Sequence, residues 1–258
     1  MKTRAFWWRK IEPVVLGVAG LLLVALLWQL ASSLRWLNPL LVSSPEQIFR
    51  AAARLSANGE LWGDLGITVV EFAISFFAAS FVGILLGLIM GWYRRAEYTF
   101  EPFLWLLFST PLIAFYPLLL VWFGFGFNTV VVMGFLFAFI PITINTMAGV
   151  KHSSPVLVRA AKSFGANNRQ ILMKVALPSA LPMIVTGLRI GVERALIGVI
   201  VGEMFCSNSG LGFHISYYGA RLETANLFVA LVIVILLGLI LTQAFRILES
   251  RLMKWRQN

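Results

Sequence analysis

Residues 67–92 read "ITVVEFAISFFAASFVGILLGLIMGW", an apolar run that holds a single charged side chain, Glu71. A helix needs roughly 20 such residues to cross the ~30 Å hydrocarbon core of a membrane. The run is continuous rather than alternating, which favours a membrane-spanning helix over a strand of a membrane barrel. It also repeats small residues every four positions, which predicts close packing on another helix, within the chain or between subunits. This small-residue stripe comprises Ser75, Ala79, Gly83, Gly87 and Gly91.

Five other runs have the same character, so the sequence predicts an all-α, polytopic membrane protein with about six spans in a single domain, residues 1–258. These runs cover residues 13–31, 103–123, 129–150, 182–205 and 227–245. Basic residues precede the first run, as in a signal peptide, but its length and the later spans indicate an uncleaved helix. The composition agrees, since 59% of the residues are hydrophobic and 12% are charged, against roughly 25% charged in soluble domains.

Cysteine and histidine offer little to metal or disulfide chemistry. The chain has one cysteine, Cys206, which excludes an internal disulfide and a cysteine-based metal site. His152 and His214 stand far apart in the sequence and are interpreted as ordinary loop residues rather than ligands. We therefore expect this chain to bind no metal and no cofactor of its own.

Lysine and arginine divide unevenly between the segments that connect the runs, and this asymmetry sets the expected orientation. With the N-terminus inside, the cytoplasmic segments hold Lys2, Arg4, Arg9, Lys10, Arg94, Arg95, Lys151, Arg159, Lys162, Arg169, Lys174, Arg246, Arg251, Lys254 and Arg256. The outer segments hold only Arg35, Arg50, Arg54 and Arg221. Both termini are therefore expected in the cytoplasm. The net charge of +10 then follows from topology and does not indicate nucleic-acid binding.

Proline and cap signals interrupt the apolar pattern in two places. In the outer segment 32–66, Ser44 is expected to cap a short helix that starts at Pro45 and lies along the membrane surface. Pro111 and Pro117 fall inside the third run, where each removes a backbone hydrogen bond and bends the helix. Such bends belong either to a kinked packing helix or to a helix that lines a hydrated cavity.

A polar segment, residues 151–181, separates the fourth and fifth runs on the cytoplasmic side. Pro155, after the potential cap Ser154, predicts the start of a helix that ends at Gly165 in the left-handed conformation. A second short helix is expected to start near Asn168 and to stop before Pro178, with extended backbone at the preceding residue, Leu177. The first helix has an apolar face formed by Leu157, Ala160, Ala161 and Phe164. The segment is either a loop packed on its own bundle or a rigid docking element for a cytoplasmic partner.

This polar segment resembles the EAA signature of bacterial ABC importer permeases, a glutamate–alanine–alanine triplet followed at fixed spacing by glycine and then by isoleucine-x-leucine-proline. The matching positions are Ala160, Ala161, Gly165, Leu177 and Pro178, with Val175 in place of the isoleucine. Arg159 occupies the place of the glutamate and reverses its charge, so a salt bridge made by that glutamate is not expected here. In that family the loop inserts into a cleft of the ATPase subunit. The resemblance implies that residues 159–178, Phe164 included, form the coupling element.

Further segments, among them "SSPEQIF", "PITINTMAGV" and "SGLGF", resemble the subfamily that transports aliphatic sulfonates, taurine, nitrate and related small solutes. The resemblance covers about residues 40–250. It implies a permease in the bacterial inner membrane, working with a second permease copy, two ATPase subunits and an extracytoplasmic binding protein. The chain has no G-x-x-x-x-G-K-[ST] motif, so ATP and Mg are expected in the partner ATPase, and the chain is not expected to be an enzyme by itself.

Ionisable residues inside the spans are energetically expensive, so they either pair or face an interior. They are Glu71, Arg189, Glu193, Arg194 and Glu203. Arg189 and Glu193 are four residues apart and are expected to pair, which leaves Arg194 to meet Glu71 or a solute anion. These residues, with Pro111 and Pro117, are candidates for the translocation pathway. The alternative is internal pairing that only holds the bundle together.

Gly210 and Gly212, close to Glu203, predict a tight turn at the outer boundary. This turn is a candidate for an outer gate or for a contact with the binding protein, with a plain re-entrant loop as the alternative. Two other functions are alternatives for the whole chain. An ion-coupled transporter often has inverted repeats, which this sequence does not show. A membrane enzyme would need a motif such as H-E-x-x-H or G-x-S-x-G, and neither occurs.

Overall fold

The computed structural model describes residues 2–34, 36, 38 and 41–252, so Arg35, Lys254 and Arg256 lie outside the described residues. The regular elements of this part are all helical, which confirms the all-α prediction. The long helices are α1 (Lys2–Ser33), α3 (Glu60–Trp92), α6 (Phe127–Lys151), α9 (Leu177–Cys206) and α11 (Thr224–Leu252). The shorter ones are α2 (Pro45–Ala57), α4 (Arg94–Ser109), η1 (Leu112–Phe115), α5 (Tyr116–Phe123), α7 (Pro155–Ser163), α8 (Asn168–Ile171), η2 (Leu172–Ala176) and α10 (Leu211–Ala220).

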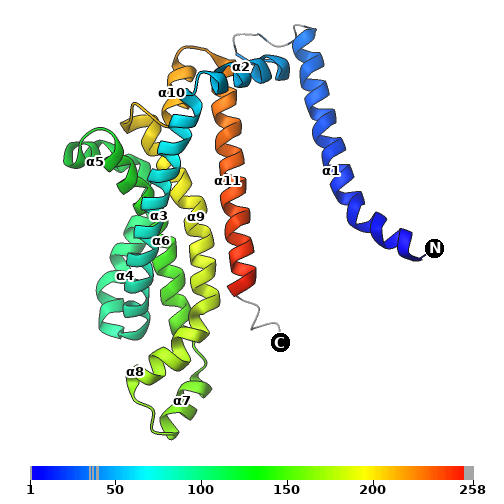
Figure 1. The fold of residues 1–258 in the computed structure, drawn as a ribbon. Helices are drawn as coiled ribbons and strands as arrows, with labels where there is room; N and C mark the ends of the chain where they lie inside the picture. The colour runs from blue at the N-terminus through cyan, green and yellow to red at the C-terminus, as the bar shows by residue number, and fades with distance from the viewer. Residues whose placement is uncertain (1, 35, 37, 39–40, 253–258) are drawn as a thin grey trace.

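Helices α3, α6 and α9 lie side by side and form the centre of the bundle (Figure 1). The small-residue stripe of α3 faces α6, because a methyl group added at Gly87 would lie 2.6 Å from Cβ of Thr146. Helix α6 approaches α9 just as closely, because a methyl group at Gly198 would lie 2.8 Å from Cα of Gly134. Small residues thus let three apolar helices approach at backbone distance. The predicted close packing is confirmed, and it occurs within the chain.

Five helices of the described chain are long and apolar enough to span a membrane, and a broken pair would make six. The third expected span, residues 103–123, is not one helix. It straddles α4 and the η1–α5 segment, which are bent by 96° relative to each other. The break falls at Thr110 and Pro111, while Pro117 lies in the first turn of α5, where a proline fits without a kink.

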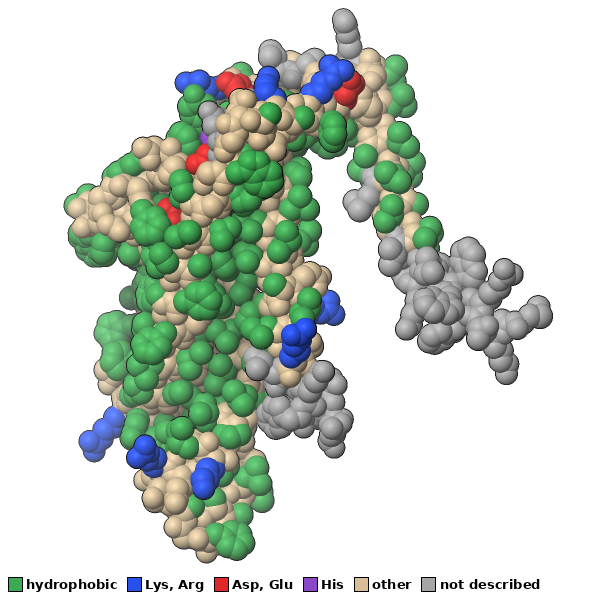
Figure 2. Space-filling view, viewed as in Figure 1, with side chains coloured by type: hydrophobic (Ala, Val, Ile, Leu, Met, Phe, Trp, Pro, Cys, Tyr) green, Lys and Arg blue, Asp and Glu red, His purple; other side chains and the backbone are tan. Residues whose placement is uncertain are grey.

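Helix α2 lies across one end of the bundle, close to α10, and α7 and α8 project from the opposite end (Figure 1). We call these the α10 end and the α7 end. The predicted cap at Ser44 is confirmed, because its hydroxyl accepts a hydrogen bond from the Gln47 N–H at 3.2 Å. Helix α1 stands away from the bundle, and no residue of its apolar window is buried. Apolar side chains cover most of the middle of the face in Figure 2, with Lys and Arg gathered towards the two ends.

The backbone at the α7 end differs from the sequence expectation in one respect. Leu177 is helical, with φ −63° and ψ −48°, so the second short helix does not stop before Pro178 but continues through η2 into α9. The prediction of extended backbone was wrong because a π-turn absorbs the proline. The Leu177 N–H donates to the carbonyl of Leu172, five residues back, and the Ser179 hydroxyl donates to the Val175 carbonyl at 2.7 Å.

Candidate functional site

The break between α4 and α5 opens a pocket of about 720 Å³ on the side of α6 and α9. Pro111 cannot continue the helix of α4, so the chain turns away and leaves a hollow between the two halves. The lining residues come from four segments: Trp105 and Phe108 of α4, residues 110–113 at the break, Phe137, Ile140, Pro141, Ile144 and Asn145 of α6, and Ile190, Arg194 and Val201 of α9.

Arg194 is the one charged residue in this lining, and the other polar side chains are Thr110 and Asn145. Both of these already donate within their own helices. The Thr110 hydroxyl donates to the Leu106 carbonyl at 2.8 Å, and the Asn145 amide donates to the Pro141 carbonyl at 2.8 Å. Arg194 has no ion pair or hydrogen bond among the described residues. The pocket therefore offers one uncommitted guanidinium surrounded by apolar and aromatic walls.

Of the other pathway candidates, Pro111 also lines this pocket, whereas the remaining five do not. Arg189 forms an ion pair with Glu249 of α11, with Nη1 and Oε2 3.6 Å apart, so the expected Arg189–Glu193 pair was wrong. The spacing of four residues allowed that pair, but it could not reveal that α11 brings Glu249 to the same side of α9. Glu193 is exposed. Pro117 lies on α5 outside the lining.

Sequence reasoning missed most of the pocket wall, including Trp105, Phe108 and Phe137. No local pattern marks these residues, because the hollow exists only once the third span is broken. Asn145 is the exception. It is the one amide in the run 129–150, and a polar side chain inside a membrane helix is a signal of a functional site, as a charge is.

Helix α7 presents its apolar side chains to the outside. Phe164 is 91% exposed and Leu157 53% exposed, and Arg159 and Ala160 are exposed beside them. The helix begins at Pro155 as expected, although the Ser154 hydroxyl makes no cap bond. Gly165 has φ +79°, which confirms the left-handed end of the helix.

The segment after Gly165 is held more firmly than α7. The side chain of Asn167 accepts from the Gln170 N–H and the side chain of Gln170 accepts from the Asn167 N–H, both at 2.9 Å, so they form a capping box. Ile171 and Ala176 are buried. Val175, Pro178 and Leu157 line an open groove of about 620 Å³ between α7 and the start of α9. The segment from Asn167 to the start of α9 is thus well anchored, and α7, with its exposed apolar side chains, is attached to it.

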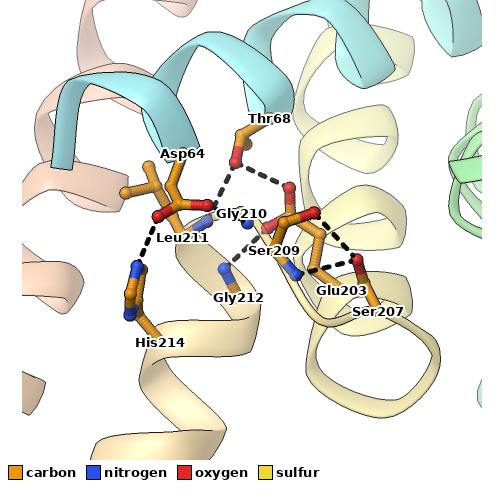
Figure 3. A network of polar contacts seen from close by, with 9 residues as sticks. All are labelled: Asp64, Thr68, Glu203, Ser207, Ser209, Gly210, Leu211, Gly212 and His214. Carbon is orange, nitrogen blue, oxygen red and sulfur yellow. Dashed lines mark hydrogen bonds and ion pairs between the residues drawn. The ribbon is translucent and has the colours of Figure 1, made fainter. Parts of the chain in front are cut away.

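At the α10 end, side chains of α3 and α9 hold the start of α10 (Figure 3). Three successive backbone N–H groups are bound: Gly210 donates to Asp64 Oδ1 at 2.7 Å, Leu211 to Thr68 Oγ1 at 3.0 Å and Gly212 to Glu203 Oε2 at 2.6 Å. The Thr68 hydroxyl in turn donates to Glu203 Oε1 at 2.6 Å. We call this arrangement of Asp64, Thr68, Glu203 and the turn 210–212 the α10 clasp.

Glycine is required in the clasp by close approach as well as by conformation. Gly210 has φ +94°, which favours glycine. A methyl group at Gly212 would lie 2.3 Å from the Ile200 carbonyl oxygen. The expected tight turn is therefore present. Glu71 lies beside Glu203 rather than beside Arg194, so the sequence was wrong to offer Glu71 as a partner for that arginine.

Comparison with known proteins agrees with this architecture. Residues 79–254 match the family described as binding-protein-dependent transport system inner membrane component. The chain is 29% identical over 253 residues to the taurine transport system permease protein TauC of Escherichia coli (strain K12), covering 96% of this chain and 92% of that protein. It is 31% identical to the putative aliphatic sulfonates transport permease protein SsuC of Bacillus subtilis (strain 168), covering 93% and 88%.

A solved structure of the MetNI methionine ABC transporter in an inward-facing conformation has a similar fold. The TM-score is 0.64 at 22% identity, over 74% of this chain and 95% of that chain. The matching family covers more than half of the sequence and includes α6, α7, α9 and α10. The chain therefore belongs to the binding-protein-dependent transport system inner membrane components, as the permease subunit of a type I ABC importer whose ATPase is a separate subunit.

Proposed function

We propose that the chain forms the membrane pathway for a small organic anion of the sulfonate type and that Arg194 binds the anionic group. The observation that carries this proposal is the guanidinium of Arg194, which is the one charged group lining the pocket and is unpaired within the described part of the chain. Guanidinium binds an oxyanion through several parallel hydrogen bonds and stays charged at any physiological pH, and Arg194 is exposed, so a solute can reach it. The apolar walls suit the short hydrocarbon part of such a solute. The names of the relatives TauC and SsuC, which refer to taurine and aliphatic sulfonates, support the same class.

The coupling element of this proposal is residues 151–181, with α7 as the part that enters the ATPase. Phe164 and Leu157 are exposed apolar side chains that a partner cleft would cover. Arg159 is exposed and forms no ion pair within the described residues, so it is available to a carboxylate of the partner. The continuous connection from α8 through η2 into α9 would transmit a displacement of α7 to the helix that carries Arg194.

The assembly we propose follows the family's mode of action, with ATPase subunits and a binding protein. In it, this permease pairs with a second copy of itself and binds two ATPase subunits, which hold ATP and Mg. The α7 end faces the cytoplasm, together with both termini, and the α10 end faces the binding protein outside the inner membrane. Support comes from the bias of lysine and arginine towards the segments at the α7 end.

The test is uptake into liposomes that contain the permease with its ATPase, supplied with loaded binding protein. Arg194→Gln should lower the uptake rate of taurine or an alkanesulfonate about tenfold or more, since hydrogen bonds to charged groups contribute about 1.5–3 kcal/mol. Arg189→Gln is the matched control, because Arg189 lies on the same helix and outside the pocket. Equal uptake by the two variants, at equal expression, would reject Arg194 as the anion site.

A further inference from the structure

Glu71 is a buried acid, one oxygen of which has no donor among the described residues. Its side chain is 1% exposed, and its Oε2 atom has no hydrogen-bond partner among the described residues. Thr68, one turn before Glu71 on α3, donates to Glu203 at 2.6 Å. Glu71 therefore faces Glu203, which is itself fully buried, within hydrogen-bonding reach. Two ionised carboxylates facing each other without solvent or a cation repel strongly, so such a pair holds a proton.

The surrounding bonds decide which member of the pair carries the charge. Both oxygens of Glu203 accept hydrogen bonds at 2.6 Å, one from the Thr68 hydroxyl and one from the Gly212 N–H. A carboxylate that accepts from two donors is stabilised in its ionised form. Glu71 has no comparable donors, so it is the member that carries the proton and donates it to Glu203. One proton then satisfies both side chains.

Other ionisable groups near the pair are few. Asp64 of α3 and His214 of α10 bind each other, with Oδ2 and Nε2 2.5 Å apart. Cys206 follows Glu203 by one turn of α9 and is buried. Helix α6 packs on α3 and α9, but its single charged residue, Lys151, is at the opposite end. Neither Glu71 nor Glu203 forms an ion pair with a lysine or arginine in the part of the chain that is described.

We propose that Glu71 and Glu203 share one proton and that this proton fastens α3 to the end of α9 and, through Glu203, to the start of α10. Removal of the proton places two like charges against each other in a closed site. Glu203 then moves and releases the Gly212 N–H and the Thr68 hydroxyl together. The α10 end of the permease is thus a closure that loosens as the pH rises. This inference does not depend on the identity of the solute.

Cys206 provides the reporter for a test, since it is the sole cysteine of the chain and is fully buried close to Glu203. The labelling rate of Cys206 by a fluorescent maleimide would be measured on the intact chain in lipid nanodiscs between about pH 6 and pH 9. Ionisation of the thiol raises the labelling rate with pH in every variant equally. The informative quantity is therefore the labelling rate of the wild type divided by that of Glu71→Gln. The amide of Glu71→Gln donates to Glu203 at any pH. We expect the wild-type rate to exceed the Glu71→Gln rate about tenfold at the alkaline limit, and to equal it at the acid limit.

Two further variants keep the test decisive. In Glu203→Gln, Cys206 should be labelled rapidly at every pH, because the amide group cannot accept from both donors. If circular dichroism shows that Glu203→Gln does not fold, Thr68→Val takes its place, since it loses one donor and keeps both acids. Asp64→Asn removes the charge that pairs with His214 and keeps an oxygen that accepts from the Gly210 N–H, so it should keep the wild-type pH response. Parallel pH profiles for wild type and Glu71→Gln would overturn the proposal. So would a response abolished by Asp64→Asn alone, which would assign the proton to His214.

Discussion

The two ends of the bundle differ in the kind of side chain that each exposes or buries. At the α7 end, apolar side chains such as Phe164 and Leu157 are exposed. At the α10 end, polar side chains such as Glu203 and Thr68 are fully buried and accept hydrogen bonds from backbone N–H groups. Exposed apolar groups are unfavourable in water unless a partner covers them, whereas buried polar groups stabilise one arrangement only while each is bonded. This contrast supports the proposal that the first end binds another protein, whereas the second holds the start of α10 against α3 and α9.

The two ends also differ in why they require glycine. Gly165, at the α7 end, has φ +79° and nothing within 4 Å of an added methyl group, so it serves the backbone conformation alone. Gly212, at the α10 end, is needed for space, because Ile200 and Glu203 approach it closely. A substitution that adds volume should therefore be far more harmful at Gly212.

The largest effect is expected for Gly212→Ala. The added methyl would lie 2.3 Å from the Ile200 carbonyl oxygen and 2.7 Å from Cβ of Glu203, so α10 must shift and the Gly212–Glu203 bond is lost. Overpacking and the lost bond together should destabilise the protein by about 3 kcal/mol or more. The measurement is the apparent melting temperature in detergent.

Gly219→Ala is the matched control for Gly212→Ala. Gly219 also lies in α10, and nothing approaches an added methyl group within 4 Å. Its melting temperature should equal or slightly exceed that of the wild type, because alanine favours helix. Similar losses in both variants would mean that α10 is sensitive everywhere and that the clasp has no special role.

The sequence predicted the spans well because lipid imposes a simple rule of length and hydropathy on each helix separately. The stripe of small residues also predicted close packing correctly, because the pattern lies on one face of a single helix and can be recognised without knowledge of its neighbours. The prediction of one continuous third span was wrong. The 96° break depends on whether the helix continues through Pro111, as it does through Pro178, or ends there. Nothing local to either proline decides that outcome.

The candidate site was harder to predict than the fold, because pairing depends on which helices become neighbours. Arg189 meets Glu249 of α11 rather than Glu193, and Glu71 meets Glu203 from a helix more than 100 positions away in the sequence. The backbone conformation at turns was easier to predict. Gly165 and Gly210 have positive φ, and glycine at a turn signals that conformation without knowledge of any neighbour.

A smaller effect on stability, with a clear effect on binding, is expected for Phe164→Ala at the α7 end. An exposed aromatic side chain adds little to the free energy of unfolding, but as a central anchor in an interface it contributes about 2 kcal/mol, or roughly 30-fold in Kd. The measurement is co-purification and titration of the ATPase with the intact permease. Phe49→Ala is the matched control, since Phe49 is 78% exposed on α2 at the opposite end. ATPase binding that is weakened equally by both variants would contradict the assignment of α7.

The smallest effect on stability is expected for the ion pair between Lys151 and Glu97, with Nζ and Oε1 2.6 Å apart. The Lys151 side chain is 40% exposed and that of Glu97 14%, so Glu97→Gln should destabilise the protein by less than about 1 kcal/mol. The pair nevertheless joins α4, which leads to the pocket wall, to the last residue of α6 before α7. We therefore expect Glu97→Gln to reduce the solute transported per ATP hydrolysed while the melting temperature stays close to that of the wild type.

Reversal of the Lys151–Glu97 pair separates charge from packing. The double variant Glu97→Lys with Lys151→Glu restores the attraction and should recover coupling, whereas each single reversal should impair it further. Arg50→Gln is the control, because Arg50 pairs with Glu46 within α2 at the other end, where the side chains are 77% and 56% exposed. It should change neither quantity. Loss of coupling in the double variant would mean that the native side chains act through packing rather than attraction. Unchanged coupling in Glu97→Gln would mean that the α7 end transmits motion through the α8–α9 connection alone.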